Sequence, residues 1–425
     1  MNQVTLRLFN ADAYPGRPRI LFVGHGHSTH VHTWVDLLDG AHFNVRLFAL
    51  NSPVPPPDWK VKTYLTSSTR GMNPIYRRQA FPPRGIGGLA VRVWNRVVNR
   101  FEKRLGVSRL VTPEKSLVNV IRDWRPDIVQ TFGLEPYGEL FFHLKERYHL
   151  EKDYGKWIVQ LRGGSDLTLN RLDPQRAGEI SRVLSACDSI LTDNKVNFDY
   201  LEQLGVDISK IASLAPVPGS GGVDVDALAE NWAMPPSQRR IILMPKAYDH
   251  IYAVTLPVFE ALKLAWERIQ PCEIHMLYMI TESTRAWYWT LPEEIRAHCH
   301  VHEKLQRHET LALMGQARVM LSPSLVDGVP NALYEAMACG TLPVISPLET
   351  IASVVEEIDN VLFARNLYPQ EIADALVRAM NDDALVDTVA VRNLARVREL
   401  ADRQVIRPKV VAFYEQLVKK QTPKA

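Results

Sequence analysis

The sequence predicts an α/β protein made of two doubly wound parallel sheets that face each other across a cleft. Three observations favour this fold class. Short apolar runs alternate with helical patterns, as is typical of βαβ units. The alternation stops once, in a segment rich in proline and glycine at 216–239. It then resumes over a stretch of similar length, which indicates a second domain.

Expected strands in the first half are short runs of buried-type residues, the first of them at 19–24. A helix is expected at 113–124, because Thr112 can cap it, Pro113 suits its first position, and Pro126 stops it. Residues 67–88, with three prolines and four glycines, are expected to form a loop. Further strands are expected at 44–50, 127–132, 157–161 and 189–192, and further helices at 31–38 and 177–186.

The sequence of the second half again predicts a parallel sheet with helices on both faces. The organisation that follows is a domain at 1–215, a linker at 216–239, a domain at 240–403 and a C-terminal helix at 404–425 that packs back on the first domain. In open parallel sheets, ligands bind beyond the carboxyl ends of the strands, so the residues that follow each strand are the site candidates. Strands are expected at 240–244, 273–279, 319–323 and 342–346, and helices at 256–268, 308–315, 330–339 and 372–380.

Composition excludes several classes of protein. With 46% hydrophobic and 23% charged residues, the 425-residue chain is typical of globular domains and not of disordered chains. The apolar runs are too short for a membrane span, and we expect no secretory leader at the N-terminus. Four scattered cysteines and no CxxC pair favour a reducing compartment, so a cytoplasmic location is expected.

Positive charge is concentrated between Lys60 and Arg109, which hold twelve basic residues and one acid. Part of this segment predicts a basic amphipathic helix. Such a helix can lie on an anionic membrane surface, at the inner face of the membrane for a cytoplasmic protein, or bind an acidic acceptor. The alternative is a surface helix whose apolar stripe packs on its own domain. The stripe comprises Leu89, Val91, Val93, Trp94, Val97, Val98 and Phe101.

The most informative segment is 322–346. A strand ends near Leu321, a loop with Asp327 and Gly328 follows, and a helix begins near Pro330. The free amides and the positive dipole end of that helix predict an anion site, which the glycine lets an anion approach closely. Glu335 lies in the second turn, so Asp327 and Glu335 can both face one ligand. Carboxylates hold sugar diols through charge-assisted hydrogen bonds.

This pattern, Pro-Ser-x-x-Asp-Gly-x-Pro-x-x-Leu-x-Glu-Ala-Met-Ala-x-Gly-x-x-Pro-Val-Ile, resembles the glycosyl transferases group 1 family (glycosyltransferase family 4), whose members are retaining enzymes of the GT-B fold. Weaker matches are Met244-Pro-Lys246, Pro126-Asp-Ile-Val-Gln130, Leu161-Arg-Gly-Gly-Ser-Asp166 and Gly222-Val-Asp224. The resemblance implies two Rossmann-like domains, of which the first binds the acceptor and the second the nucleotide sugar. It implies a retaining hexosyltransferase that moves a sugar from a nucleotide diphosphate to a hydroxyl acceptor. The expected acceptor is a glycan or a lipid-linked or polysaccharide precursor, and no nucleic acid is expected as a partner.

The resemblance also assigns roles to residues. Glu335 is expected to hold the ribose, and Asp327 the hydroxyls of the donor sugar. Binding of the diphosphate is expected from Lys246, Gly24, Gly26, Gly328, Val329, Pro330 and Asn331. Three positions depart from the family: Asp327 replaces the usual Glu, Lys246 stands without the Arg that often precedes it, and Gln130 replaces a His.

The chemistry requires stabilisation of the leaving diphosphate. Lys246 and helix dipoles can provide it electrostatically, so we expect no metal and no cofactor. Asp166, on a loop after a predicted strand, is the protein carboxylate expected to contact the reacting sugars together with Asp327. Arg162 is expected to bind an acidic acceptor or a phosphate, and a surface salt bridge is its alternative.

Four histidines, His25, His27, His30 and His32, follow the first strand. Their spacing is also found in dinuclear zinc hydrolases, so a metal-dependent hydrolase that uses His25, His27 and His30 is one alternative function. A non-catalytic nucleotide-sugar-binding protein is another. We favour a loop and helix start at which His30 or His32 contacts the acceptor. The loop at 304–307 is a further candidate for lining the base pocket.

Overall fold

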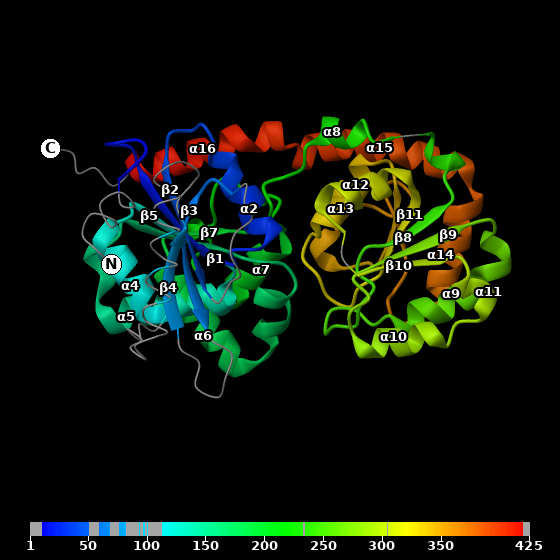
Figure 1. Cartoon of the computed structure of the whole chain (residues 1–425), viewed down its shortest axis with the longest axis horizontal. Coiled ribbons are helices and arrows are strands. Elements are labelled where there is room, and N and C mark those ends of the chain that lie inside the picture. The colour runs from blue at the N-terminus through cyan, green and yellow to red at the C-terminus, as the bar shows by residue number, and fades with distance from the viewer. Residues whose placement is uncertain are drawn as a thin grey trace.

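The structure, a computed structural model, describes residues 11–50, 59–68, 76–81, 93, 97, 100, 113–232, 234–303 and 305–419. Two sheets lie side by side with helices around each, and the strands of the two sheets belong to two successive parts of the chain (Figure 1). This confirms the prediction of two doubly wound α/β sheets. Among the described residues, no helix combines the length and the apolar character that a membrane span requires.

The first sheet has seven strands in the order β4-β3-β2-β1-β5-β6-β7. All neighbours are parallel except β3 and β4, which are antiparallel. The strand β4 lies within 67–88, so the prediction that this whole stretch is a loop was wrong. The strands are β1 Arg19–Gly24, β2 Asn44–Leu50, β3 Lys62–Ser68, β4 Tyr76–Phe81, β5 Ile128–Phe132, β6 Lys156–Gln160 and β7 Ser189–Leu191.

The second sheet has six strands in the order β10-β9-β8-β11-β12-β13, and all its neighbours are parallel. Its strands are β8 Ile241–Met244, β9 Glu273–Leu277, β10 Cys299–His302, β11 Ala317–Ser322, β12 Leu342–Ile345 and β13 Leu362–Phe363.

Parallel neighbours need crossover connections, and helices provide most of them. In the first part they are α2 Thr29–Val35, α4 Pro113–Trp124, α5 Glu139–Tyr148, α6 Pro174–Ala186 and α7 Val196–Gln203. Later in the chain follow α8 Val225–Ala229, α9 Leu256–Ile269, α10 Glu282–Trp289, α11 Glu293–Arg296, α12 Arg307–Gln316, α13 Asn331–Ala338, α14 Pro369–Asn381, α15 Asp383–Ala401 and α16 Arg403–Lys419.

Strand β1 shows how the first sheet fills a core on each face. Side chains alternate between faces along a strand. Leu21 and Val23 belong to the core under α4, α5 and α6, whereas Ile20 and Phe22 belong to the core under α2 and α16. The chain's last helix therefore completes the hydrophobic core of its first domain, as Figure 1 shows for the red helix α16 above the blue strands.

A buried chain of hydrogen bonds fixes α16 in this position. Tyr414 accepts from Trp34 Nε1 at 2.9 Å and donates to Gln130 Oε1. Gln130 donates to Gln160 Oε1 at 2.8 Å, and Gln160 donates to the carbonyl of Gly219 at 3.0 Å. Gln130, one of the three positions where the sequence departs from the family, therefore connects the C-terminal helix to the segment that leaves the first domain.

The chain passes between the two sheets twice, and the two crossings touch. The amide of Val223 donates to Ala401 O at 2.8 Å, and the amide of Arg403 donates to Val223 O at 2.9 Å. Gly222 has φ of +84°, and a Cβ there would lie 2.4 Å from Ala401 O. Only glycine therefore fits this position without strain.

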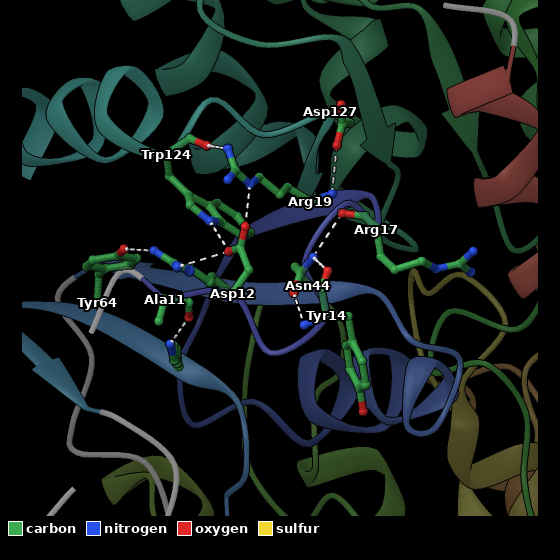
Figure 2. A network of polar contacts seen from close by, with 11 residues as sticks. Ala11, Asp12, Tyr14, Arg17, Arg19, Asn44, Tyr64, Trp124 and Asp127 are labelled. Atoms are coloured by element: carbon green, nitrogen blue, oxygen red, sulfur yellow. Dashed lines mark hydrogen bonds and ion pairs between the residues drawn. The ribbon is translucent and has the colours of Figure 1, made fainter. Parts of the chain in front are cut away.

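The segment at 11–19 runs across the amino ends of β1, β2 and β3, where Asp12 is the centre of a polar network (Figure 2). Asp12 accepts from Arg19 Nε at 2.7 Å, from Trp124 Nε1 at 2.9 Å and from Arg46 Nη2 at 3.4 Å. Arg46 also donates to Tyr64 OH at 2.8 Å. Burial opposes the ionisation of Asp12, but the hydrogen bonds from Trp124 and Arg19 outweigh burial and lower its pKa.

Candidate active site

The loops that follow β1, β6 and β7 touch the loop that precedes α13. We name residues 323–330 the α13 loop and the contact region the interdomain junction. Gly163 lies so close to Gly328 that a Cβ on Gly163 would be 2.5 Å from the Gly328 amide nitrogen. A Cβ on Gly164 would be 2.7 Å from Val326. Two glycines after β6 thus let the first domain approach the α13 loop.

The α13 loop is held by its own domain. Thr350 Oγ1 donates to Asp327 O at 2.8 Å, and the amide of Gly328 donates to Asp327 Oδ1 at 2.9 Å. Pro330 lies directly before α13, and no side chain caps the helix start. The amino end of α13 is therefore presented to the junction with its dipole uncompensated by a local carboxylate cap.

Lys246 and Asp327 form an ion pair of 2.8 Å between Nζ and Oδ2. Lys246 follows β8, and Asp327 belongs to the loop after the neighbouring strand β11. Burial would lower the pKa of Lys246, but Asp327 outweighs burial and raises it, so the lysine stays cationic. The lysine expected to bind a diphosphate and the carboxylate expected to bind a sugar are therefore adjacent.

Glu335 lies in the second turn of α13, and its side chain is only 8% exposed. Among the described residues, its ion-pair partner is Arg307, the first residue of α12, at 2.7 Å between Nη2 and Oε1. Burial raises the pKa of Glu335, and the arginine partly offsets this. Glu335 thus faces the interior of its domain beside a cation and does not project from an outer surface.

His30 reaches across the junction. Asn331 Nδ2 donates to His30 Nδ1 at 2.7 Å, which joins the start of α2 to the start of α13. His30 is exposed to solvent, but the protein at the junction still disfavours its charged form and, together with the nearby cations Arg162, Lys246 and Arg307, lowers its pKa to about 4. His30 is therefore neutral at physiological pH and acts as a hydrogen-bonding group.

The other histidines of the cluster point to separate partners. His25 Nδ1 shares a hydrogen bond of 2.7 Å with Tyr137 OH, and His32 Nε2 is 2.8 Å from Gly26 O. The His32 ring also stacks on Trp59 at 3.9 Å. In the part of the chain that the structure describes, no three His, Cys, Asp or Glu side chains come together to hold a metal. The geometry gives the hydrolase alternative no ligand set.

Asp166 has a different setting from the one expected. It is 2% exposed, and its Oδ2 accepts from the amides of Leu134 at 2.9 Å and Arg162 at 2.6 Å. Burial raises its pKa to about 7, although these amides act against the shift. A carboxylate enclosed in this way has no exposed surface that a sugar could contact in this arrangement. The structure instead makes Asp166 a positioning residue that joins the loops after β5 and β6.

Arg162 extends from the same loop across Gly133, where a Cβ would lie 2.9 Å from Arg162 Cδ. Its charge lowers the pKa of both His25 and His30, after burial as the main cause, so the guanidinium lies near both rings. Within the described residues, no carboxylate forms an ion pair with it. Gly24 and Gly26 are buried at the end of β1, on the same edge of the first sheet.

Several junction residues were missed in the sequence. Asp193, after β7, accepts from the amide of Val329 at 3.3 Å. Tyr200 of α7 donates to Glu349 of the second domain. Arg171 stacks on the Tyr200 ring at 3.7 Å and lies 3.9 Å from Glu349. The partners in the two interdomain hydrogen bonds are 136 and 149 residues apart in the chain, so no local sequence pattern indicates these contacts.

Solved structures share this fold along the whole chain. Sucrose-phosphate synthase from Thermosynechococcus elongatus is 15% identical, with a TM-score of 0.66, and the match covers 95% of this chain and 100% of that one. HepE from Anabaena, in complex with UDP, is 9% identical, with a TM-score of 0.61 and coverage of 94% and 100%. An α,α-trehalose 6-phosphate synthase from Burkholderia multivorans is 16% identical, with a TM-score of 0.61 and coverage of 96% and 100%. At these identities the likeness establishes the fold, which is the GT-B arrangement of two Rossmann-like domains.

Part of the second domain is similar in sequence to a known family. Residues 258–382 match the family model described as Glycosyl transferases group 1. No curated protein sequence matches the chain. The matched segment contains the α13 loop, Arg307 and Glu335, so the second domain is similar to the group 1 glycosyltransferases over the stretch on which the resemblance was based.

Proposed function

We propose that the protein transfers a sugar, a hexose, from a nucleotide diphosphate sugar to a hydroxyl acceptor, with retention of anomeric configuration. One observation carries the proposal. Lys246, the α13 loop and Glu335 follow the carboxyl ends of the neighbouring strands β8 and β11, and the α13 loop touches the first domain. A cation and a helix amino end suit a diphosphate, and a largely buried carboxylate suits a ribose diol.

The leaving diphosphate gains negative charge as its bond to the anomeric carbon breaks. Lys246 and the amino end of α13 are placed to stabilise that charge, with Arg307 nearby. This role of protein cations supports a reaction without a metal or another cofactor. The acceptor hydroxyl gives its proton to the departing phosphate oxygen, so no protein base is required on this route.

The acceptor is proposed to be anionic. The Arg162 guanidinium lies beside His25 and His30 on the first-domain side of the junction, where a phosphate or carboxylate would be its natural partner. A lipid-linked or polysaccharide precursor with a phosphate fits this feature. His30 would contribute a neutral hydrogen bond to the same molecule, whereas His32 is engaged by Trp59 and Gly26.

A thermal-shift panel tests the donor site. The similar Anabaena protein is titled as a complex with UDP and with UDP-glucose, so UDP is the first nucleotide to test, followed by GDP and ADP. Saturation at about 100-fold over the dissociation constant adds about 2.7 kcal/mol to the free energy of unfolding. Glu335→Ala should remove most of that shift, and Glu260→Ala, an α9 surface carboxylate, should keep it.

A second panel separates transfer from mere binding. Nucleotide binding without release of nucleotide diphosphate, across phosphorylated and neutral acceptors, would support the non-catalytic alternative. No binding of any nucleotide diphosphate would contradict the donor site itself.

Membrane association is proposed for the basic segment Lys60–Arg109. Most of its predicted helix lies outside the described residues, but Val93 and Val97 are described there, are helical and are 52% and 45% exposed. Two exposed valines on the predicted apolar stripe favour a surface that is free to meet lipid. Replacement of Arg92, Arg96 and Arg100 by Gln should lower binding to vesicles that contain anionic lipid. Unchanged partitioning at low salt would contradict the proposal.

A further inference from the structure

Asp193 crosses the interdomain junction, and the role of its carboxylate is not explained by the proposed roles of the other site residues. It follows β7 in the first domain, and Asn194 Nδ2 donates to its Oδ1 at 2.8 Å. Asn197 braces the same turn, because its Nδ2 donates to Thr192 Oγ1 at 2.7 Å and its amide to Asn194 Oδ1 at 3.0 Å. Asp193 is thus held in a fixed direction by its own loop.

The other carboxylate oxygen of Asp193, Oδ2, points toward the α13 loop. The amide of Val329 donates to Oδ2 at 3.3 Å, and a Cβ on Gly328 would lie 2.7 Å from the same oxygen. Both residues belong to the short stretch that offers amides to an anion at the start of α13. A carboxylate from the opposite domain therefore sits where the proposed function needs a phosphate oxygen.

The surroundings of Asp193 do not compensate its charge. Its side chain is 8% exposed, and no lysine or arginine among the described residues forms an ion pair with it. The titratable groups that face it are Asp327 of the α13 loop, Asp166 of the loop after β6, and Tyr334 of α13. Burial raises the pKa of Asp193 to about 6, and Asp327 adds to the shift.

We propose that Asp193 competes with the diphosphate of the donor for the amide of Val329, so that donor binding displaces this carboxylate and loosens the junction. The proposal rests on the proposed function, because it assumes a nucleotide diphosphate at the α13 loop. Asp193 acts as an intramolecular anion that couples occupancy of the donor site to the contact between the domains. A phosphate oxygen and an ionised carboxylate cannot share one amide without strong repulsion.

Isothermal titration calorimetry with UDP, GDP and ADP tests the competition. Asp193→Asn keeps the shape of the side chain without the charge, and Asp193→Ala removes the competing oxygen. We expect both variants to bind the preferred nucleotide about ten-fold more tightly than wild type at about pH 8, a typical coupling energy. At about pH 5 most of the wild-type protein has a protonated Asp193 carboxyl. The higher affinity of the variants should then shrink to a difference of about two-fold or less. The nucleotide's own phosphate titrates equally in both experiments. The ratio of the variant's affinity to the wild-type affinity is therefore independent of that titration.

Glu349→Gln is the matched control. It alters another interdomain carboxylate contact, with Tyr200 and Arg171, and leaves the α13 amides unchanged. Equal affinities of Asp193→Asn and wild type would overturn the proposal. An equal gain in Glu349→Gln would also overturn it, because loosening the junction in general would then explain the gain. If wild type binds no nucleotide diphosphate, the proposed function itself fails.

Hydrogen exchange on the wild-type chain tests the same proposal without a substitution. Saturating UDP, or the nucleotide found to bind, should slow exchange of the amides at 328–333 and speed exchange of those at 193–197. Slower exchange in both segments would overturn the displacement of Asp193.

Discussion

Two ion pairs beside the junction form within the second domain, and this pairing decides how their members can act. Lys246 is held by Asp327 and Glu335 by Arg307, so two cations and two carboxylates stand in line along one edge of the second sheet. A ligand that carries both a diphosphate and hydroxyls can replace one partner in each ion pair, with the diphosphate on a cation and a hydroxyl on a carboxylate. These charges sum to zero before such a ligand binds, and the diphosphate then adds negative charge beside Lys246.

Replacement of Lys246 by Ala should lower turnover by about 100-fold or more, because it removes a cation beside the developing charge of the leaving group. Lys246→Arg keeps the charge and should retain a larger share of turnover. The measurement is nucleotide diphosphate release at saturating donor. Lys263→Ala on α9 is the matched control, and a loss of similar size in that variant would contradict a specific role for Lys246.

The sequence located part of this site and missed the rest for a physical reason. Asp327, Asn331 and Glu335 stand in one continuous pattern, where a strand end, a glycine and a helix start can be recognised together. The burial of Asp166 could not be foreseen, because one of the amides that surround it comes from Leu134, 32 residues away. Asp193 was missed for the same reason, since its partner Val329 belongs to the other domain.

Among the elements, the segment at 11–19 has the clearest structural task. It fastens two strands and the end of α4 through Asp12, which receives hydrogen bonds from Arg19, Arg46 and Trp124 (Figure 2). These donors belong to three separate elements, so one carboxylate aligns a strand, a neighbouring strand and the end of α4. The interaction is far from the junction and serves stability.

Asp12→Ala should lower the free energy of unfolding by about 2 to 4 kcal/mol, because it leaves partly buried donors without their acceptor. The check is urea denaturation with turnover measured in parallel. Asp39→Ala, a carboxylate that is 68% exposed and pairs with Lys60, should change the free energy of unfolding by about 0.5 kcal/mol or less. Equal effects of the two substitutions would show that the network in Figure 2 does not hold the segment.

One misjudged element, β4, lies at the edge of the first sheet. The central strand β1 is an unbroken apolar run and was predicted within its observed bounds. Strand β4 reads Tyr-Arg-Arg-Gln-Ala-Phe, has only one neighbour and runs antiparallel to it. An edge strand needs no continuous apolar run, so its sequence resembles that of a loop.

At the scale of the whole molecule, buried carboxyl groups make stability depend on pH. Burial raises the pKa of Asp166 to about 7 and of Asp193 to about 6, whereas an unfolded aspartate titrates near about 3.9. Between these values the folded chain binds more protons than the unfolded chain. These two groups therefore make the free energy of unfolding fall as pH rises from about 4 to about 7.

Asp166→Asn should flatten that fall, because it removes one of the two titrating groups and keeps an oxygen for the amides of Leu134 and Arg162. The comparison is the urea midpoint of variant and wild type at intervals between about pH 4 and about pH 8. Groups with lowered pKa, such as Asp12, affect both proteins alike. Parallel curves would contradict the raised pKa of Asp166.

The contribution of α16 to the first domain has a consequence for biosynthesis. Ile406, Val410 and Tyr414 emerge from the ribosome more than 200 residues after Leu191, the last residue of the first sheet. At bacterial or eukaryotic elongation speeds this delay is roughly 10 to 40 s. For that time Phe22 and Trp34 lack their covering helix, so the nascent amino-terminal half carries an apolar surface that chaperones can bind until translation ends.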